Sequence, residues 1–280
     1  MPTAEAVITY VICRHMANVE ASGITIDNIL KQLETIIVES EKTGCRLGYF
    51  AALYYKVTAG VKDGIAKGRF QDGRRMEHLD IVFASRYLDA LAAWRSGQPL
   101  TESWRLAFNA SKQSNLLVLQ HLLLGISAHI NLDLGIAAVE VAGSSLENLH
   151  NDFDEINTII SALTYEVLND IDRVSPLLSL LGLHAGNNSS ILIQFSIDNA
   201  RDGAWCFAEE LVTKKGADYQ ACIAKRDQTI YRLGGGLVRT TGFMNFTIWL
   251  IHLFEWKSPA KIINVLHKAV KNKIVLNRNG

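Results

Sequence analysis

Cysteine and proline are both scarce in this chain of 280 residues, which has four of each. The cysteines stand far apart and form no C-x-x-C pair, so they indicate neither a zinc knuckle nor a disulfide framework. Reduced, partly buried cysteines suit a cytosolic protein, and we expect a cytoplasmic location. The N-terminus has no basic segment before its first apolar run, so we expect no signal peptide.

An excess of charge of either sign is also missing. The chain has 28 basic and 28 acidic residues, a balance that gives no electrostatic footprint for nucleic acid, and we expect no nucleic-acid partner. The phosphate-binding G-x-x-x-x-G-K-[ST], the nucleophile elbow G-x-S-x-G and the metalloprotease H-E-x-x-H do not occur. None of these three reaction classes is therefore indicated.

Apolar residues are abundant, at 49% of the chain, and they recur at the three-and-four spacing of helices rather than in alternation. We predict an all-α fold: one domain over residues 1–280, a multi-helix bundle around a buried central helix at about 115–141. Residues 234–236, three glycines in a row, predict a flexible join before the last two helices. The expected helices cover 3–19, 26–43, 46–67, 74–96, 100–112, 115–141, 145–173, 176–184, 189–214, 217–233, 241–256 and 258–272.

The central helix carries ionisable side chains within its apolar run. A helix that is apolar on all sides is buried in protein or in lipid. His121, His129 and Asp133 would be expensive at the centre of a bilayer, and no basic cluster flanks the run, so we expect no integral membrane span. Inside a protein these groups require partners, and the partners define a candidate site.

His129 and Asp133 are four residues apart and share a helix face. A pair at that spacing can ligate one divalent metal such as Zn or Fe, or it can form a hydrogen bond. His121, two turns earlier, is a third candidate ligand that would need a shift in angle. The alternative is a core histidine that the carboxylate holds in place.

A short link at 142–144 makes the next helix an antiparallel neighbour of the central one. Counting equal distances from that turn places Asp152 and Asn157 near the level of Asp133 and His129. We therefore predict Asp152 as a second catalytic carboxylate and Asn157 as a hydrogen-bond partner. Ordinary solvation of a helix surface is the other interpretation of both.

Asp80 and Arg86 lie on a helix whose apolar stripe includes Met76 and Phe83. A carboxylate on that stripe is out of place, so Asp80 is a candidate catalytic residue. Arg86 can pair with a buried carboxylate or grip an anionic substrate. A structural ion pair is the alternative for both residues.

Two further features lie towards the C-terminus. Arg201 and Trp205, four apart on one helix, are candidate substrate-binding residues, with Trp205 as a core residue being the plainer interpretation. The last helices are rich in lysine and aromatic residues, a composition that can lie on a membrane. A packed terminal helix with a solvated lysine face is the interpretation that we favour there.

Four segments together resemble a known family. In order along the chain they are RRMEHLDIVFASRYLDAL, VLQHLLLGISAHINLDLGIA, the stretch from Asp152 to Asn157, and ARDGAW. They resemble segments of the family catalogued as domain of unknown function 5995, over about residues 45–210. That family has no settled activity, so the resemblance implies no particular reaction.

The L-G-x-x-x-H-x-x-x-D core is also similar to a helix of the zinc-dependent phospholipase C and single-strand nuclease family. That similarity implies zinc ligands at His129 and Asp133 on an all-α scaffold. The ligating N-terminal tryptophan and the further histidines of that family have no counterpart here.

These features together favour a small-molecule enzyme with a buried His/Asp pocket that takes a partly hydrophobic substrate. Metal-dependent hydrolysis of an ester or phosphoester is one chemistry for such a pocket. Metal-free acid–base catalysis of a cyclase or isomerase type is another. A non-enzymatic helical binding or scaffold protein is the alternative from a different class.

Overall fold

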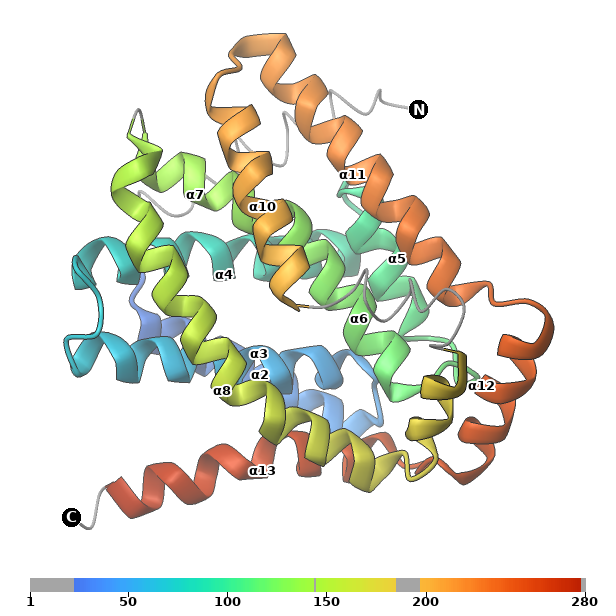
Figure 1. Ribbon diagram of the computed structural model, residues 1–280. Helices are drawn as coiled ribbons and strands as arrows, with labels where there is room; N and C mark the ends of the chain where they lie inside the picture. The colour runs from blue at the N-terminus through green and yellow to red at the C-terminus, as the bar shows by residue number, and fades with distance from the viewer. Residues whose placement is uncertain (1–22, 144, 185–196, 278–280) are drawn as a thin grey trace.

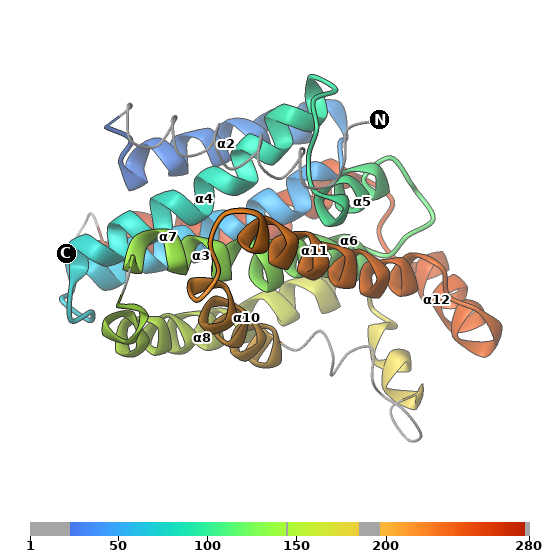
Figure 2. The same cartoon turned by 90° about the horizontal axis from the view of Figure 1, so that it is seen from above.

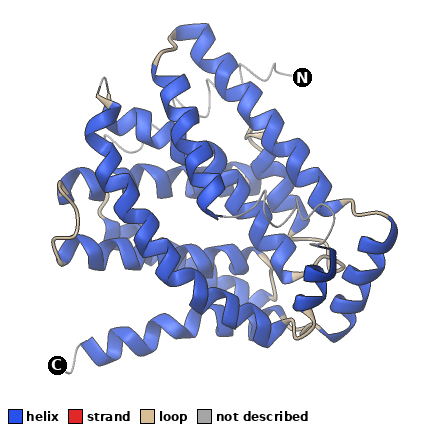
Figure 3. Cartoon of the chain, viewed as in Figure 1, coloured by secondary structure: helices blue, strands red, loops and turns tan. Residues whose placement is uncertain are grey.

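Helices make up the regular structure throughout residues 23–143, 145–184 and 197–277, the part of the chain that the computed structural model describes (Figure 3). The all-α prediction is confirmed, and most predicted boundaries fall within about three residues of the observed ones. The predicted helix at 3–19 and the start of that at 189–214 lie outside the described residues. The main helices are α2 (Ile26–Thr43), α3 (Leu47–Ala66), α4 (Gly73–Arg95), α5 (Glu102–Ala110), α6 (Val118–Ala128), α7 (Gly135–Ala142), α8 (His150–Val174), α10 (Ile197–Val212), α11 (Gly216–Val238), α12 (Gly242–Phe254) and α13 (Pro259–Asn277).

Local signals at the helix ends explain several of these boundaries. Thr25 caps α2 by accepting from the backbone of Asn28, whose side chain returns a contact to the Thr25 backbone. Asp72 caps α4 by accepting from the Arg75 backbone N–H at 3.0 Å. Gly44 ends α2 with φ of 68°, a left-handed conformation that glycine adopts without strain.

The central helix passes between two groups of helices. On one side α6, the π-turn after it, and α7 contact α3, α4 and α5, and on the other they contact α10 and α11. Seen from above, α2 and α4 lie towards one side of the molecule and α8 and α10 towards the other, with α3, α6 and α7 between them (Figures 1 and 2). Side chains at the middle of the central helix are therefore enclosed.

This helix differs from the prediction in one respect. It runs from Val118 to Ala142, but residues His129–Leu134 form a π-helix rather than an α-helix. Its length and composition would allow it to cross a membrane, yet 78% of its most apolar window is buried within the protein, as in a core helix. A π-turn inside an α-helix frees backbone carbonyls, and Arg226 of α11 donates to one of them, that of Asn131, at 2.9 Å.

The flexible join predicted at residues 234–236 is wrong. These glycines belong to α11, which continues to Val238. Gly234 is buried, and a Cβ there would meet Leu106 Cδ2 at 2.8 Å and Leu124 Cδ2 at 3.1 Å. The missing side chain lets α11 approach α5 and α6 closely, so at this position the glycine serves packing rather than flexibility.

Gly125 of α6 has the same role against α3, and we expect Gly125→Ala to destabilise the protein by about 1–3 kcal/mol. A Cβ at this position would lie 2.5 Å from Phe50 Cδ2 and force that ring to move. Gly236→Ala is the matched control, because it is also helical and has no atom within 4 Å of its Cβ. Gly236→Ala should raise the free energy of unfolding by about 0.5–1 kcal/mol, because alanine favours the helix more than glycine does. Equal denaturation midpoints for the two variants would contradict the close approach.

Candidate functional site

The π-turn of the central helix holds the predicted His129–Asp133 pair. His129 Nδ1 lies 3.2 Å from Asp133 Oδ2, and both side chains are buried. The two side chains are therefore within hydrogen-bonding distance of each other. π-turns within α-helices occur frequently at functional sites, and both residues of the pair belong to this one.

Asp133 is held by two more donors from two other helices. Arg86 Nε of α4 donates to Oδ1 at 3.1 Å, and Trp104 Nε1 of α5 donates to Oδ2 at 2.8 Å. Burial alone would raise the pKa of Asp133, but the hydrogen bond from His129, the Arg86 charge and the Trp104 N–H together hold that pKa below its ordinary value. Asp133 is thus a buried, ionised carboxylate.

Arg86 is shared between two acids. Besides Asp133 it contacts Glu140 Oε1 of α7 through Nη1, at 3.4 Å. Burial would lower the pKa of Arg86, whereas the two carboxylates raise it, so the guanidinium remains charged. The prediction that Arg86 pairs with a buried carboxylate is confirmed, and its role as a grip for an anionic substrate is not supported by these contacts.

Five aromatic rings surround the His129 imidazole. Phe83 stacks on it with ring centroids 3.6 Å apart and planes 5° from parallel, and Tyr54 meets it edge-on at 4.5 Å. The remaining three rings, with centroids between 5.8 and 6.1 Å away, are Phe50, Tyr87 and Trp104. We call these five residues, from α3, α4 and α5, the aromatic cage.

The protonation state of His129 follows from these surroundings. Burial lowers the pKa of His129, Asp133 opposes that effect and the Arg86 charge adds to it, with a net lowering. The imidazole is therefore neutral at pH 7, and its single proton is on Nδ1, because an ionised carboxylate can only accept. Nε2 is left as an acceptor, buried and without a hydrogen-bond partner among the described residues. A buried acceptor in this state is costly unless something else binds to it.

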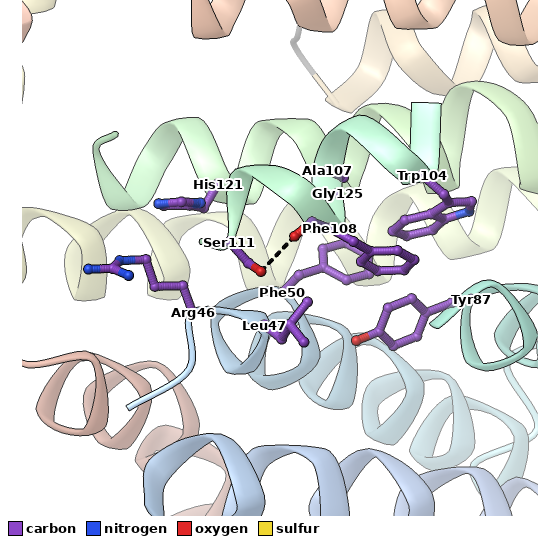
Figure 4. Close-up of a pocket in the computed structure, with 10 residues that line it drawn as sticks. All are labelled: Arg46, Leu47, Phe50, Tyr87, Trp104, Ala107, Phe108, Ser111, His121 and Gly125. Atoms are coloured by element: carbon purple, nitrogen blue, oxygen red, sulfur yellow. Dashed lines mark hydrogen bonds between the residues drawn. The ribbon is translucent and has the colours of Figure 1, made fainter. Parts of the chain in front are cut away.

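A pocket adjoins the cage on the side of α5 and α6 (Figure 4). It encloses about 20 Å³ of free space, enough for about one water molecule, and is partly open to solvent. Phe50, Tyr87 and Trp104 belong to both the pocket wall and the cage, so these rings separate the pocket from His129. The remaining lining residues are Arg46, Leu47, Ala107, Phe108, Ser111, His121 and Gly125.

The predicted third ligand, His121, lines this pocket and does not join the His129–Asp133 pair. Burial and the nearby Arg46 charge lower the pKa of His121 to about 4, so it is neutral at pH 7. Its Nε2 is buried with no partner in the described part of the chain. The Arg46 guanidinium likewise makes no hydrogen bond or ion pair within residues 23–143, 145–184 and 197–277. A cation and a polar ring thus flank one end of the pocket, and aromatic rings line the other (Figure 4).

Asp80 is buried on α4, as its position on the apolar stripe predicted. It does not pair with Arg86, whose partners are Asp133 and Glu140. Its Oδ2 is buried and has no hydrogen-bond partner among the described residues, and the buried hydroxyls of Tyr54 and Thr58 lie near each other. Burial, and to a lesser degree the charge of Glu77, raise the pKa of Asp80 to about 8. Asp80 is therefore a protonated acid at neutral pH.

We expect Asp80→Asn to stabilise the protein increasingly as the pH rises. The pKa of Asp80 is 3.8 unfolded and about 8 folded, so folding takes up a proton between those values and stability falls as pH increases through them. The amide cannot ionise and removes this dependence. The unpaired donors of the amide cost about the same at every pH, which leaves a net gain of about 2–3 kcal/mol at pH 8 and a net loss of about 2 kcal/mol at pH 4. Urea unfolding at the two pH values measures it, and a constant difference between the proteins would contradict the burial argument.

The prediction that Asp152 lies beside Asp133 is wrong. Asp152 is buried, but it accepts from the backbone N–H of Gln71 at 2.6 Å and of Asp72 at 3.2 Å, and from Arg75 Nη2 at 2.7 Å. It therefore fastens α8 to the loop before α4. Phe153 does pack with Leu134, near the level that the counting gave, but α8 packs along α3 and α13 rather than along the central helix, and Asp152 faces the loop before α4.

The other predicted residues lie apart from the pair. Arg201 is buried, donates to the Phe153 carbonyl at 2.9 Å and stands over the Phe153 ring, so it joins α10 to α8. Trp205 packs against Phe153 and donates to Glu209 Oε1 at 3.0 Å. Neither lines the pocket. Asn157 is part of α8, but its side chain lies outside the described residues.

Most of the aromatic cage escaped prediction from the sequence, as did Glu140 and Arg46. A signal for the cage was present, because two pairs of rings stand at helical spacing: Phe50 with Tyr54, and Phe83 with Tyr87. Such pairs are ordinary in hydrophobic cores. These two pairs differ from ordinary core pairs because all four rings contact the His129 imidazole. That contact depends on how α3 and α4 pack against the π-turn, and the spacing of the rings along the chain does not determine it.

The donors at His129 and Asp133 do not fit a divalent metal. Both Asp133 oxygens already accept from Arg86, Trp104 and His129, and a guanidinium beside the carboxylate repels a cation. No cluster of three or more His, Cys, Asp or Glu side chains able to hold a metal occurs in the part of the chain that the structure describes. This arrangement favours chemistry that needs no metal at the pair.

Comparison with known proteins gives one match. The family model described as "Family of unknown function (DUF5995)" matches residues 26–240, which cover all the helices that form the pair, the cage and the pocket. Neither the curated proteins nor the solved structures gave a match. The similarity to the zinc-dependent phospholipase C helix stays a prediction.

Proposed function

The chain belongs to this family of unknown function, and we propose that it is a metal-free acid–base enzyme acting on a partly hydrophobic small molecule. The observation that carries the proposal is the unpartnered Nε2 of His129. Asp133 fixes the neutral tautomer, as the carboxylate does in other Asp–His catalytic pairs, so Nε2 is oriented to take a proton.

Two buried carboxylic groups with opposite proton affinities support this chemistry. The pKa of Asp133 is lowered by its three donors, whereas burial raises that of Asp80 to about 8. Pairs of groups whose surroundings push their pKa values apart are characteristic of acid–base sites. Tyr54 lies between the two: its ring contacts His129, and its hydroxyl is within the electrostatic reach of Asp80. His129 would accept a proton, and the Asp80–Tyr54 side would supply one.

The charge distribution favours this direction of transfer. When His129 Nε2 gains a proton, the imidazolium that forms lies 3.2 Å from an ionised carboxylate that is already in place. Such preorganised compensation lowers the barrier for the proton transfer. A reaction that removes a proton at one atom and returns one at another, as in isomerisation or cyclisation, requires no further reactant.

The pocket indicates the kind of molecule. Its inner end is aromatic, which suits an apolar ring or chain, and a ligand of that size enters and reaches His129 only when the rings of Phe50, Tyr87 and Trp104 turn aside and widen the pocket. At the other end the Arg46 guanidinium suits a carbonyl or carboxylate oxygen, and the unpartnered Nε2 of neutral His121 suits a hydroxyl or N–H donor. We therefore propose an amphipathic substrate with one polar or anionic end.

Thermal-shift screening of apolar ring compounds, in matched pairs with and without a carboxylate, tests the binding part. Compounds that raise the melting temperature are then incubated with the protein and followed by mass spectrometry, with and without a chelator. We expect the compound to be converted to a product of the same mass. The rate of conversion should be the same with and without the chelator. Binding without conversion would indicate a carrier, and conversion that a chelator abolishes would restore the metal hypothesis.

A further inference from the structure

Helix α12 presents a row of large apolar side chains to the solvent. Phe243 is 68% exposed, Phe246 54% and Trp249 57%. Phe246 stacks between the other two, with ring centroids 6.3 Å from Phe243 and 5.8 Å from Trp249. Leu253 and Phe254, each more than half exposed, continue the row. We call these five residues the α12 ridge.

The ridge is a face of the helix rather than a scatter of side chains. Its first four members recur at three-and-four spacing along Gly242–Phe254, and Phe254 follows the last of them, while Thr247 and Ile251 on the adjoining face are buried against the protein. Monomeric proteins rarely expose a contiguous apolar face of this kind unless it binds something. By contrast α13 buries Ile262, Ile263 and Leu266, so the packed terminal helix that the sequence favoured describes α13 and not α12.

The charges around the ridge identify the occupant. Helix α12 itself contains no Asp, Glu, Lys or Arg. The exposed charged residues that flank it are all cationic: Arg239 before it and Lys257 and Lys261 after it. The one acid in this stretch, Glu255, is buried and accepts from the Val118 backbone N–H and the Ser175 hydroxyl. Aromatic residues with a cationic border match the headgroup region of an anionic bilayer.

We propose that α12 docks the protein on the surface of a membrane containing anionic lipid, lying in the interface without crossing it. The helix has 13 residues, too few to span a bilayer. The ridge enters the headgroup and acyl boundary, and the flanking cations meet the lipid phosphates. If a second copy of this chain bound the ridge through its own ridge, the cationic residues that flank the two ridges would face and repel each other.

The docking helix is fixed to the helix that carries the pocket. Glu255, immediately after α12, accepts from the N–H of Val118 at the start of α6, three residues before His121. Docking therefore places the Arg46–His121 end of the pocket near the lipid, where an amphipathic substrate would be dissolved. This consequence rests on the proposed function, whereas lipid binding by α12 does not.

Sedimentation with vesicles tests the proposal on the full chain. We expect binding to vesicles of phosphatidylcholine mixed with phosphatidylglycerol, and at least tenfold weaker binding to phosphatidylcholine alone. Phe246→Ser with Trp249→Ser should lower binding to the mixed vesicles at least tenfold. Leu168→Ser, at a 45%-exposed leucine of α8, is the matched control and should bind normally. Arg239→Glu with Lys261→Glu should remove the preference for the anionic lipid, and Lys31→Glu on α2 should not.

Two results would overturn the proposal. One is wild-type protein that stays in solution with both kinds of vesicle. The other is a dimer, seen by light scattering, that the Phe246→Ser and Trp249→Ser variant converts to monomer, because the ridge would then be an interface between copies. Circular dichroism and the thermal midpoint of each variant establish that it is folded. A variant that loses lipid binding but keeps turnover in detergent separates this proposal from the proposed function.

Discussion

Arg86→Met is expected to lower the free energy of unfolding by about 3–5 kcal/mol. The substitution keeps an unbranched side chain of similar length but removes the one cation that contacts both Asp133 and Glu140 in the described structure. Asp133 retains its hydrogen bonds from Trp104 and His129, yet its charge loses a guanidinium 3.1 Å away in a buried setting. An uncompensated buried charge is far more costly than a lost surface pair.

Arg95→Met is the matched control on the same helix. Arg95 contacts Glu39 at 3.3 Å, but both side chains are about half exposed, and such surface pairs contribute about 0–1 kcal/mol. Urea denaturation of both variants measures the difference. Adding Asp133→Leu to Arg86→Met should recover part of the loss, because it removes one of the stranded carboxylates. An Arg86→Met protein as stable as the Arg95→Met protein would contradict the ion-pair network.

The sequence was sufficient to predict the fold class and the element that carries the site. Three-and-four spacing and glycine punctuation located the described helices because each helix must bury one face. The apolar run around His129 and Asp133 indicated a buried pair for the same reason. Those inferences depend only on residues close together in the chain, where helical geometry fixes the distances.

The partners from other helices could be predicted only in part. Arg86 was predicted to meet a buried carboxylate, but its sequence position did not say whether that was Asp80 or Asp133. The choice depends on how α4 packs against the π-turn, and the π-turn itself has no evident sequence signal. Asp152 shows a different failure, since its assignment assumed that α8 runs along the central helix, whereas α8 packs along α3 and α13.

His129→Gln is expected to reduce turnover of a substrate found by the screen at least 100-fold, the usual range for loss of a positioned general base. The glutamine side chain can still donate to Asp133, so the carboxylate keeps a partner while the basic Nε2 is lost. Substrate affinity should change little, because Nε2 lies behind the pocket wall. His78→Gln, at an exposed histidine of α4, is the matched control and should turn over normally.

The pH dependence of turnover distinguishes a base from a merely structural histidine. Only neutral His129 can accept a proton, and its folded pKa lies below the ordinary 6.5 because burial and Arg86 disfavour the charged form. The wild-type rate should therefore hold below pH 6.5 and fall only at the lowered pKa, whereas the residual rate of His129→Gln should lack that inflection. A His129→Gln enzyme that keeps both the rate and the inflection would show that another group is the base, and the oriented Nε2 would then be a packing feature of the aromatic cage.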